Sequence, residues 1–156
     1  VINKLQEAGC LITIEKNSIQ LEAPKRIKPL EIKTMPYPGF PTDMQSVFAS
    51  MLTTAKGTSI IVENIFENRY KYAQELNKMG AKITAQGKSA FFEGVKELSG
   101  SPVYATDLRA GSALIMAGII AKGETQVYNI EHIDRGYENI EQKFRNLGAN
   151  IKRVTE

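Results

Sequence analysis

The stretch Thr106-Asp-Leu-Arg-Ala-Gly-Ser-Ala-Leu-Ile-Met-Ala-Gly-Ile-Ile-Ala-Lys-Gly123 decides how this chain folds. Either of its first two residues can cap a helix by accepting hydrogen bonds from free N–H groups, and its last glycine can end the helix in a left-handed conformation. No residue in 110–121 is charged, so the helix shows apolar or small side chains in every direction. We therefore expect it to be buried all round. At about 14 residues it is too short to cross a bilayer, so its surroundings must be protein.

The composition is that of one globular domain. The chain has 156 residues, of which 42% are hydrophobic and 24% charged, which is enough for a domain with a core. Its net charge of +3 is weak and scattered, which argues against nucleic-acid and membrane partners but allows a small anionic ligand. A single cysteine, Cys10, excludes an internal disulfide and fits a reducing compartment such as the cytoplasm. Because the chain starts at Val1 and already reads as helix there, we expect it to be a piece of a longer protein.

The sequence repeats itself with a period of about 70 residues. An apolar residue, a glycine four positions later and an isoleucine three positions after that occur together three times. A second register agrees with the first, because the tripeptide Ala-Lys-Gly occurs at 55–57 and 121–123 and an arginine follows each by 12 positions. The glycines of the first register are Gly9, Gly80 and Gly148, and the arginines of the second are Arg69 and Arg135.

Each glycine is typical of the residue after a helix, and each isoleucine of a strand that follows. A complete unit is predicted to be strand, apolar helix, strand, amphipathic helix and hairpin, or βαβαββ. Sheets with one wet face around apolar helices predict an α/β fold of the inside-out barrel type, with helices inside and sheets outside. The predicted apolar helices are 43–56 and 108–122, the strands after them 58–63 and 124–128, and the hairpins 11–14 with 19–22 and 82–85 with 89–93.

The repeat divides the chain into three parts of one incomplete domain. Residues 1–36 are the tail of one repeat, residues 37–100 a second repeat, and residues 101–156 a third that lacks its last strand. The first and second parts are joined by a proline-rich loop that leaves Asp43 near a helix N-terminus. We expect both ends of the domain to be missing.

Familiar catalytic, nucleotide-binding and metal-binding motifs are absent, so no metal or cofactor is expected. What recurs is a set of charged residues at equivalent positions: Asp43 and Asp107 start the apolar helices, Arg109 is in a first helical turn, and Arg69 and Arg135 follow the strands. If they converge at one end of the domain, helix N-termini and arginines would attract an anion. Asp43 can then accept a proton from a substrate hydroxyl.

These residues also have purely structural interpretations. Asp43 and Asp107 can each be a helix N-cap without any part in binding or catalysis. Arg69 and Arg135 can form surface salt bridges with acidic neighbours in the sequence. Those neighbours are Glu67 and Asp134.

Four blocks of sequence carry a resemblance to a known family: Tyr37-Pro-Gly-Phe-Pro-Thr-Asp-Met-Gln45, Glu67-Asn-Arg69, Ala105-Thr-Asp-Leu-Arg-Ala-Gly111 and His132-Ile-Asp-Arg-Gly-Tyr137. In this order they closely resemble the enolpyruvyl transferases, and among them the C-terminal part of the UDP-N-acetylglucosamine 1-carboxyvinyltransferases. The resemblance implies two inside-out α/β domains of three repeats each, with the active site in the cleft between them. It also implies transfer of the enolpyruvyl group of phosphoenolpyruvate to the 3′-hydroxyl of UDP-N-acetylglucosamine, with release of phosphate, early in peptidoglycan synthesis.

The resemblance assigns roles to six residues. Asp43 would be the base at the sugar hydroxyl, and Ile65 would contact the UDP-sugar through its backbone. The cations that face phosphoenolpyruvate would stabilise developing charge, and Asp107 would orient them. These cations are Arg69, Arg109 and Arg135.

The rest of the family's active site is expected on an N-terminal domain that is missing from this chain. That domain carries the family's reactive cysteine loop, which Cys10 does not match, and its Lys-Asn pair. We therefore expect half an active site and no transferase activity from these 156 residues alone. Two alternatives remain: a transferase like enolpyruvylshikimate phosphate synthase, which shares the fold and a Pro-Thr-Asp motif, and a non-catalytic anion-binding domain of the same fold.

Overall fold

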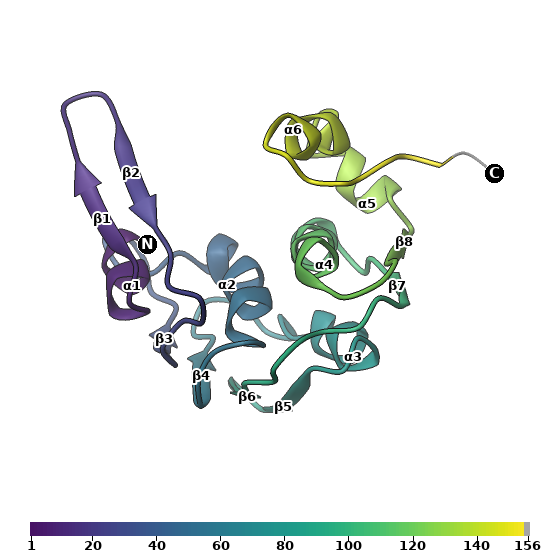
Figure 1. The fold of residues 1–156 in the computed structure, drawn as a ribbon. Helices are drawn as coiled ribbons and strands as arrows, with labels where there is room; N and C mark the ends of the chain where they lie inside the picture. Colours follow the sequence, from purple (N-terminus) through teal and green to yellow (C-terminus); the bar gives the residue numbers. More distant parts are fainter. Residues whose placement is uncertain (155–156) are drawn as a thin grey trace.

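The computed structural model describes residues 1–154. Helices and strands alternate along most of this length (Figure 1). In chain order the elements are α1 (Ile2–Glu7), β1 (Leu11–Ile14), β2 (Ile19–Glu22), β3 (Glu31–Lys33), η1 (Thr42–Met44), α2 (Gln45–Leu52), β4 (Thr58–Val62), α3 (Tyr72–Lys78), β5 (Lys82–Gln86), β6 (Ser89–Glu93), β7 (Pro102–Tyr104), α4 (Leu108–Ile120), β8 (Gln126–Tyr128), α5 (Glu131–Asp134) and α6 (Ile140–Asn146).

The strands form three separate sheets. The largest has the order β3-β4-β6-β5, in which β3 is parallel to β4 and the other neighbours are antiparallel. A two-stranded parallel sheet pairs β7 with β8, and a hairpin pairs β1 with β2. Both predicted hairpins are confirmed, and the predicted strands after the two apolar helices are confirmed as β4 and β8.

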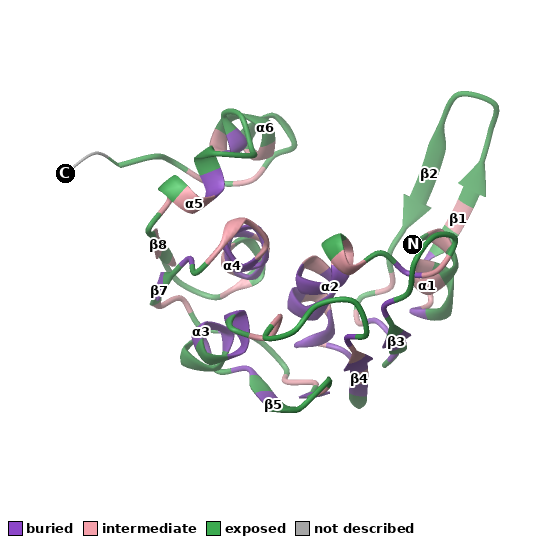
Figure 2. Cartoon of the chain, turned by 180° about the vertical axis from the view of Figure 1, so that it is seen from behind, coloured by how far each residue is buried: buried purple, intermediate pink, exposed green. Residues whose placement is uncertain are grey.

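Helices α2 and α4 pack against each other on the inner side of the sheets, where Figure 2 shows the buried residues concentrated. Two serine hydroxyls of α2 donate hydrogen bonds to backbone carbonyls of α4: Ser46 to Arg109 at 2.9 Å and Ser50 to Ala113 at 2.7 Å. The four-stranded sheet buries one face against the helices and exposes alternate residues on the other. The α/β class with helices inside and sheets outside is confirmed, although residues 1–154 close no barrel.

The three predicted helix-ending glycines share one backbone motif. Gly9, Gly80 and Gly148 have φ of +97°, +88° and +95°. In each case the glycine N–H bonds to the carbonyl three residues earlier and the next N–H to the carbonyl five residues earlier, at 2.9–3.1 Å. This is the Schellman motif, which needs a left-handed residue that glycine adopts without steric cost. Helices α1, α3 and α6 therefore end in the same way.

Helix α4 confirms the predicted N-cap and corrects the prediction at its other end. Asp107 caps α4, since its carboxylate accepts hydrogen bonds from the N–H groups of Arg109 and Ala110. The helix ends at Ile120, before the predicted boundary, and Ala121 is extended. Gly123 has a φ of +94° but lies beyond the helix end. None of the helices in residues 1–154 is long and apolar enough to cross a membrane.

The expectation that α4 is buried all round is wrong for its last turn. Residues 110–115 are buried, whereas Ile119 is 40% and Ile120 51% exposed. Within residues 1–154, helices α2, α3 and α5 and strand β8 pack on α4, and the last turn of α4 is left partly uncovered. Helix α2 is also shorter than predicted, because Thr53 and Thr54 bond through their hydroxyls to carbonyls of the preceding turn and end the helix at Leu52.

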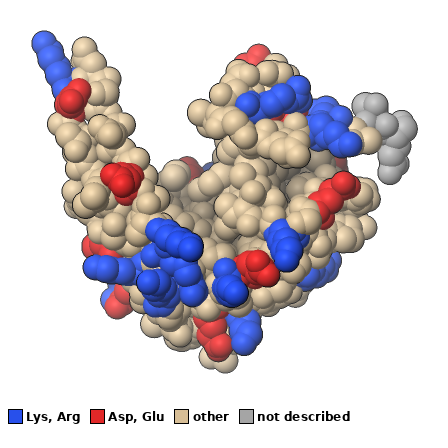
Figure 3. Space-filling view, viewed as in Figure 1, with Lys and Arg blue, Asp and Glu red and all other residues tan. Residues whose placement is uncertain are grey.

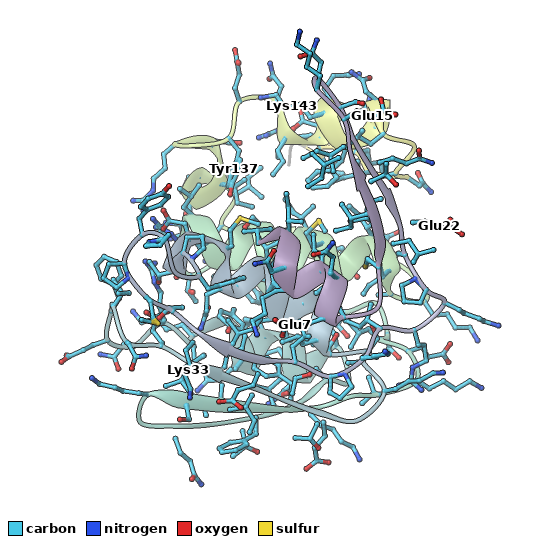
Figure 4. All side chains as sticks on the ribbon, turned by 90° about the vertical axis from the view of Figure 1, so that its left-hand side faces the viewer. Glu7, Glu15, Glu22, Lys33, Tyr137 and Lys143 are labelled. Carbon is cyan, nitrogen blue, oxygen red and sulfur yellow. The ribbon has the colours of Figure 1, made fainter. Side chains whose placement is uncertain are left out.

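The β1–β2 hairpin does not bury a face within residues 1–154. Its apolar side chains Leu11, Ile14 and Ile19 are 70%, 62% and 58% exposed, so the prediction of one wet face fails here. Figure 4 views the molecule from this hairpin, with Glu15 and Glu22 labelled on it, and Figure 3 shows a wide notch between the hairpin and the lobe of α5 and α6. A strand predicted from Ile151 is also absent from the described residues, which offer it no pairing partner there.

Candidate active site

Asp43 lies in the 3₁₀ turn η1 that leads into α2. The N-cap position of α2 is Met44, and no side chain caps that helix, so the interpretation of Asp43 as an N-cap is wrong. Its carboxylate instead accepts a hydrogen bond from Nε of Arg109 at 2.6 Å. The Asp43 side chain remains 65% exposed, which leaves it accessible to a ligand.

Arg109 is held in place from two directions. Its N–H donates to the carboxylate of Asp107 at 2.9 Å, and its carbonyl accepts from Ser46 of α2. Asp107 thus fixes the backbone of Arg109, while Asp43 contacts the guanidinium. The capping interpretation is correct for Asp107, whose carboxylate accepts from the backbone N–H groups of Arg109 and Ala110.

Arg69 joins the same group from the segment after β4. One of its terminal nitrogens lies 3.9 Å from the Asp43 carboxylate, and its Nε donates to the hydroxyl of Thr42 at 3.4 Å. Its guanidinium stacks on the ring of Phe66, with 4.5 Å from Cζ to the ring centre, a cation–π contact that holds its orientation. Two cations therefore flank one carboxylate, leaving a surplus positive charge.

Arg135 lies at the same end of α4 but makes no ion pair within residues 1–154. A Cβ on the next residue, Gly136, would come within 2.9 Å of the Leu108 side chain, which shows how closely this segment approaches the start of α4. The alternative pairing with Asp134 is wrong, because that carboxylate pairs with Arg153 at 2.7 Å.

The other alternative pairing, between Arg69 and Glu67, is also wrong, since no salt bridge joins them among the described residues. Arg69 points its guanidinium at the Asp43 side of the loop instead. The structure thus brings Asp43, Arg69 and Arg109 into contact and leaves Arg135 nearby with an exposed side chain.

Ile65 follows β4 and presents one free backbone group. Its N–H donates to the carboxylate of Glu63 at 2.8 Å, whereas its carbonyl accepts no hydrogen bond from the residues that the structure describes. Its side chain is half-exposed. The free carbonyl is the group that can contact a ligand.

Sequence analysis missed Glu63, which is only 2% exposed. Its carboxylate bonds to Thr34, to Thr42 and to the backbone of the Ile65 turn. A signal was present in the sequence, because a single acidic residue ends the otherwise apolar strand Ser-Ile-Ile-Val. An acid at such a place needs hydrogen-bonding partners if it is buried.

Tyr70 lies near this group and is unsuited to acid–base chemistry. Burial raises the pKa of Tyr70 to about 12, so the phenol stays neutral at ordinary pH. Its hydroxyl is within hydrogen-bond distance of the carbonyls of Ile61 and Lys88, at 2.9 and 3.0 Å. Asp43 is therefore the better placed proton acceptor.

The group of Asp43, Arg69 and Arg109 lies at the surface, with the Asp43 side chain 65% exposed. The residues in the described range contain no cluster of three His, Cys, Asp or Glu side chains able to hold a metal ion. A hollow bounded by α4, β8, α5 and residues 150–154 contains none of the six predicted site residues. The predicted site residues therefore lie outside this hollow.

Comparison with known proteins places the chain among enolpyruvyl transferases. The sequence model of the family described as EPSP synthase (3-phosphoshikimate 1-carboxyvinyltransferase) matches residues 1–144. The UDP-N-acetylglucosamine 1-carboxyvinyltransferase of Desulfofundulus thermocisternus is 56% identical over 154 residues, covering 99% of this chain and 63% of that protein. UDP-N-acetylglucosamine 1-carboxyvinyltransferase 1 of Clostridium perfringens is 57% identical, covering 99% of this chain and 37% of that protein. The predicted resemblance is confirmed.

Solved structures show the same fold. The enolpyruvyl transferase NikO from Streptomyces tendae superposes with a TM-score of 0.90 at 26% identity, covering 99% of this chain and 36% of NikO. An EPSP synthase from Acinetobacter baumannii gives a TM-score of 0.69 at 20% identity, covering 98% of this chain and 36% of that structure. The latter likeness shows the fold alone. In each case the chain spans only part of its relative.

Proposed function

Because the chain belongs to the EPSP synthase family, we propose that it is the C-terminal part of a UDP-N-acetylglucosamine 1-carboxyvinyltransferase. The names of relatives at 56% and 57% identity favour this substrate over 3-phosphoshikimate. The complete enzyme would transfer the enolpyruvyl group of phosphoenolpyruvate to the 3′-hydroxyl of UDP-N-acetylglucosamine and release phosphate. It would act in the cytoplasm, in the synthesis of peptidoglycan precursors.

The observation that carries this proposal is the contact of Asp43 with Arg109, beside Arg69. An exposed carboxylate can take the proton of the 3′-hydroxyl while the hydroxyl oxygen bonds to the central carbon of phosphoenolpyruvate. The C=C bond opens in this step, and its terminal carbon takes up a proton from an acid that the proposed N-terminal domain would supply. The two guanidinium groups suit the carboxylate and phosphate of the same substrate, because each offers a planar fork of N–H donors. They would stabilise the negative charge of the tetrahedral intermediate until phosphate leaves.

The remaining predicted residues would complete one wall of the proposed site. The free carbonyl of Ile65 would contact the UDP-sugar, and Arg135, whose side chain is exposed beside the start of α4, would add a third cation for phosphoenolpyruvate. Asp107 would fix the position of the Arg109 backbone by capping α4. No step in this scheme uses a metal or a cofactor.

We propose that the opposite wall belongs to an N-terminal domain. The exposure of Asp43, whose side chain is 65% accessible, supports a site that a second domain covers. Residues 1–36, 37–100 and 101–156 would be the tail of one repeat, a second repeat and a third repeat of the C-terminal domain. The shared glycine motif that ends α1, α3 and α6 supports this division.

Phosphate release tests the proposal directly. The 156-residue chain and the same chain joined to an N-terminal domain of a relative are assayed with phosphoenolpyruvate and UDP-N-acetylglucosamine. We expect turnover only from the joined protein; turnover by the chain alone would contradict the half-site. Turnover by the joined protein only with 3-phosphoshikimate in place of UDP-N-acetylglucosamine would favour the EPSP synthase alternative. No turnover with either substrate would favour a non-catalytic domain.

A further inference from the structure

Glu63 is a buried carboxylate that is held by hydrogen-bond donors alone. It is 2% exposed, and no Lys, Arg or His in residues 1–154 forms a salt bridge with it. The hydroxyls of Thr34 and Thr42 donate to it at 2.7 and 2.9 Å, and the backbone N–H groups of Ile65 and Phe66 at 2.8 and 3.2 Å. A buried charge is costly unless such partners surround it.

These four donors come from three different segments. Thr34 directly follows β3, Thr42 belongs to η1 beside Asp43, and the two N–H groups belong to the turn after β4. Glu63 itself is attached to the sheet, because its N–H donates to the carbonyl of Lys88 at 2.8 Å. Its carboxylate therefore joins η1 and the turn after β4 to the C-terminal end of β4, an inner strand of the four-stranded sheet.

The contacts of Glu63 lead to both sides of the candidate site. On one side, the hydroxyl of Thr42 donates to Glu63 and accepts from Nε of Arg69, which lies next to Asp43. On the other side, the carboxylate occupies the N–H of Ile65, so that only the carbonyl of that residue remains free. An apolar side chain in place of Glu63 would stabilise the core at least as well as a buried charge. It would form no hydrogen bond to η1 or to the turn after β4.

We propose that Glu63 is a positioning residue for the sugar-binding side of the site. It sets the spacing between the Asp43 carboxylate and the Ile65 carbonyl without touching the substrate. This inference rests on the proposed function, which gives those two groups their ligand. Thr42 transmits the effect of Glu63 to Arg69.

The test compares Glu63→Gln with a control variant, Glu75→Gln, in the chain joined to the N-terminal domain of a relative. Glu75 is also buried and contacts no residue of the site; its carboxylate accepts from the backbone N–H of Tyr104 at 2.9 Å and, unlike that of Glu63, pairs with Lys78 at 2.7 Å. Both variants keep the shape of the side chain and remove its charge.

Hydrogen–deuterium exchange gives the first readout, without any substrate. We expect the amides of Ile65 and Phe66 to exchange about tenfold faster in Glu63→Gln, because a neutral amide oxygen replaces the charged acceptor of their hydrogen bonds. In Glu75→Gln the same amides should exchange at the parent rate. Equal exchange in the two variants would overturn the proposal.

Steady-state kinetics give the second readout. We expect Glu63→Gln to raise KM for UDP-N-acetylglucosamine about tenfold, by the same hydrogen-bond argument, with a smaller effect on KM for phosphoenolpyruvate. Faster exchange with an unchanged sugar KM would overturn the positioning role. If the parent protein shows no turnover at all, the proposed function fails, and the exchange measurement still decides whether Glu63 holds the loop.

A second pair of variants covers the case in which Glu63→Gln does not fold. Thr42→Val removes one donor to Glu63, and Thr42→Ser keeps the hydroxyl. We expect Thr42→Val to raise the sugar KM and Thr42→Ser to restore it. The same KM for UDP-N-acetylglucosamine in both variants would mean that the Thr42 hydroxyl does not affect sugar binding, and would overturn the proposal.

Discussion

Asp43 and Arg109 are 66 residues apart in the sequence, yet Nε of Arg109 donates a hydrogen bond to the Asp43 carboxylate at 2.6 Å. Both residues stand at the starts of inner helices, and Ser46 and Ser50 join those helices through bonds to backbone carbonyls. The packing of α2 on α4 therefore brings the carboxylate and the guanidinium together.

Replacement of Asp43 by Asn tests its role as a base. An amide keeps the shape of the side chain but cannot accept the proton, so kcat of the joined protein should fall by a factor of about 10²–10⁴. Phosphate release measures this, and Glu22→Gln on the exposed hairpin is the control. A kcat equal to that of the parent would show that another group takes the proton.

Replacement of Arg135 by Ala should change substrate binding, whereas replacement of Arg153 by Ala should change stability. Arg135 makes no ion pair among the described residues, whereas Arg153 pairs with Asp134 and Glu141. We expect Arg135→Ala to raise KM for phosphoenolpyruvate about 10- to 100-fold, as loss of a charge-assisted hydrogen bond does, with little change in stability. Arg153→Ala should lower the urea midpoint and leave KM unchanged. An unchanged KM for phosphoenolpyruvate in Arg135→Ala would show that Arg135 does not contact this substrate.

Gly111→Ala should displace α5 from α4. An added Cβ would lie 2.8 Å from Cδ1 of Ile133 and closer still to its Cγ1. Overpacking of this kind costs about 1–3 kcal/mol in the free energy of unfolding. The double variant with Ile133→Ala removes the clash, so the two effects should not add. Additive losses in urea denaturation would show that α5 is not packed as described.

Gly80→Ala should destabilise the chain through its backbone alone. Gly80 has a φ of +88°, and an added Cβ would meet no atom within 4 Å. The left-handed conformation costs a residue with a Cβ about 1–2 kcal/mol, which urea denaturation can measure. Gly80→Asn should cost less, because asparagine tolerates this conformation better. Equal losses would mean that the turn has changed its conformation.

The stability of the lobe of α5 and α6 should fall in acid. Hydrogen bonds from Arg153 lower the pKa of Asp134 and of Glu141 below their ordinary values of 3.8 and 4.5. A carboxyl group whose pKa is lower in the folded state stabilises the fold above its unfolded pKa, and this contribution disappears as the pH falls through the folded pKa. Urea midpoints for the parent and Arg153→Gln should therefore differ at pH 7 and approach each other as the pH falls below the ordinary values of 3.8 and 4.5 and through the lowered pKa values of the two carboxyl groups. A constant difference would exclude the ion pairs.

Local signals predicted most of the fold. The glycine motif, the two hairpins and the N-cap of α4 depend on a few neighbouring residues, and they are confirmed. The boundaries failed where side chains or packing intervened, as at Leu52, where two threonine hydroxyls end the helix. The burial of Ile119 and Ile120 could not be judged from their own hydrophobicity, because it depends on which elements lie beside them.

The candidate site was predicted less completely. Asp43 and Asp107 look alike in the sequence, but only Asp107 caps a helix, since a 3₁₀ turn precedes α2 and directs its acid elsewhere. The pairing of Asp43 with Arg109 depends on helix packing, which no local pattern encodes. Glu63 was missed because its two side-chain partners, Thr42 and Thr34, lie 21 and 29 residues away along the chain.

The two serine bonds between α2 and α4 also bear on the thermodynamics of binding. The carbonyl of Arg109 is held by Ser46, so the guanidinium extends from a backbone that cannot rotate freely. The backbone of Arg109 is therefore ordered on folding, and its guanidinium is held by Asp43, before any ligand arrives. Binding to this wall then carries only a small entropic penalty from ordering the protein.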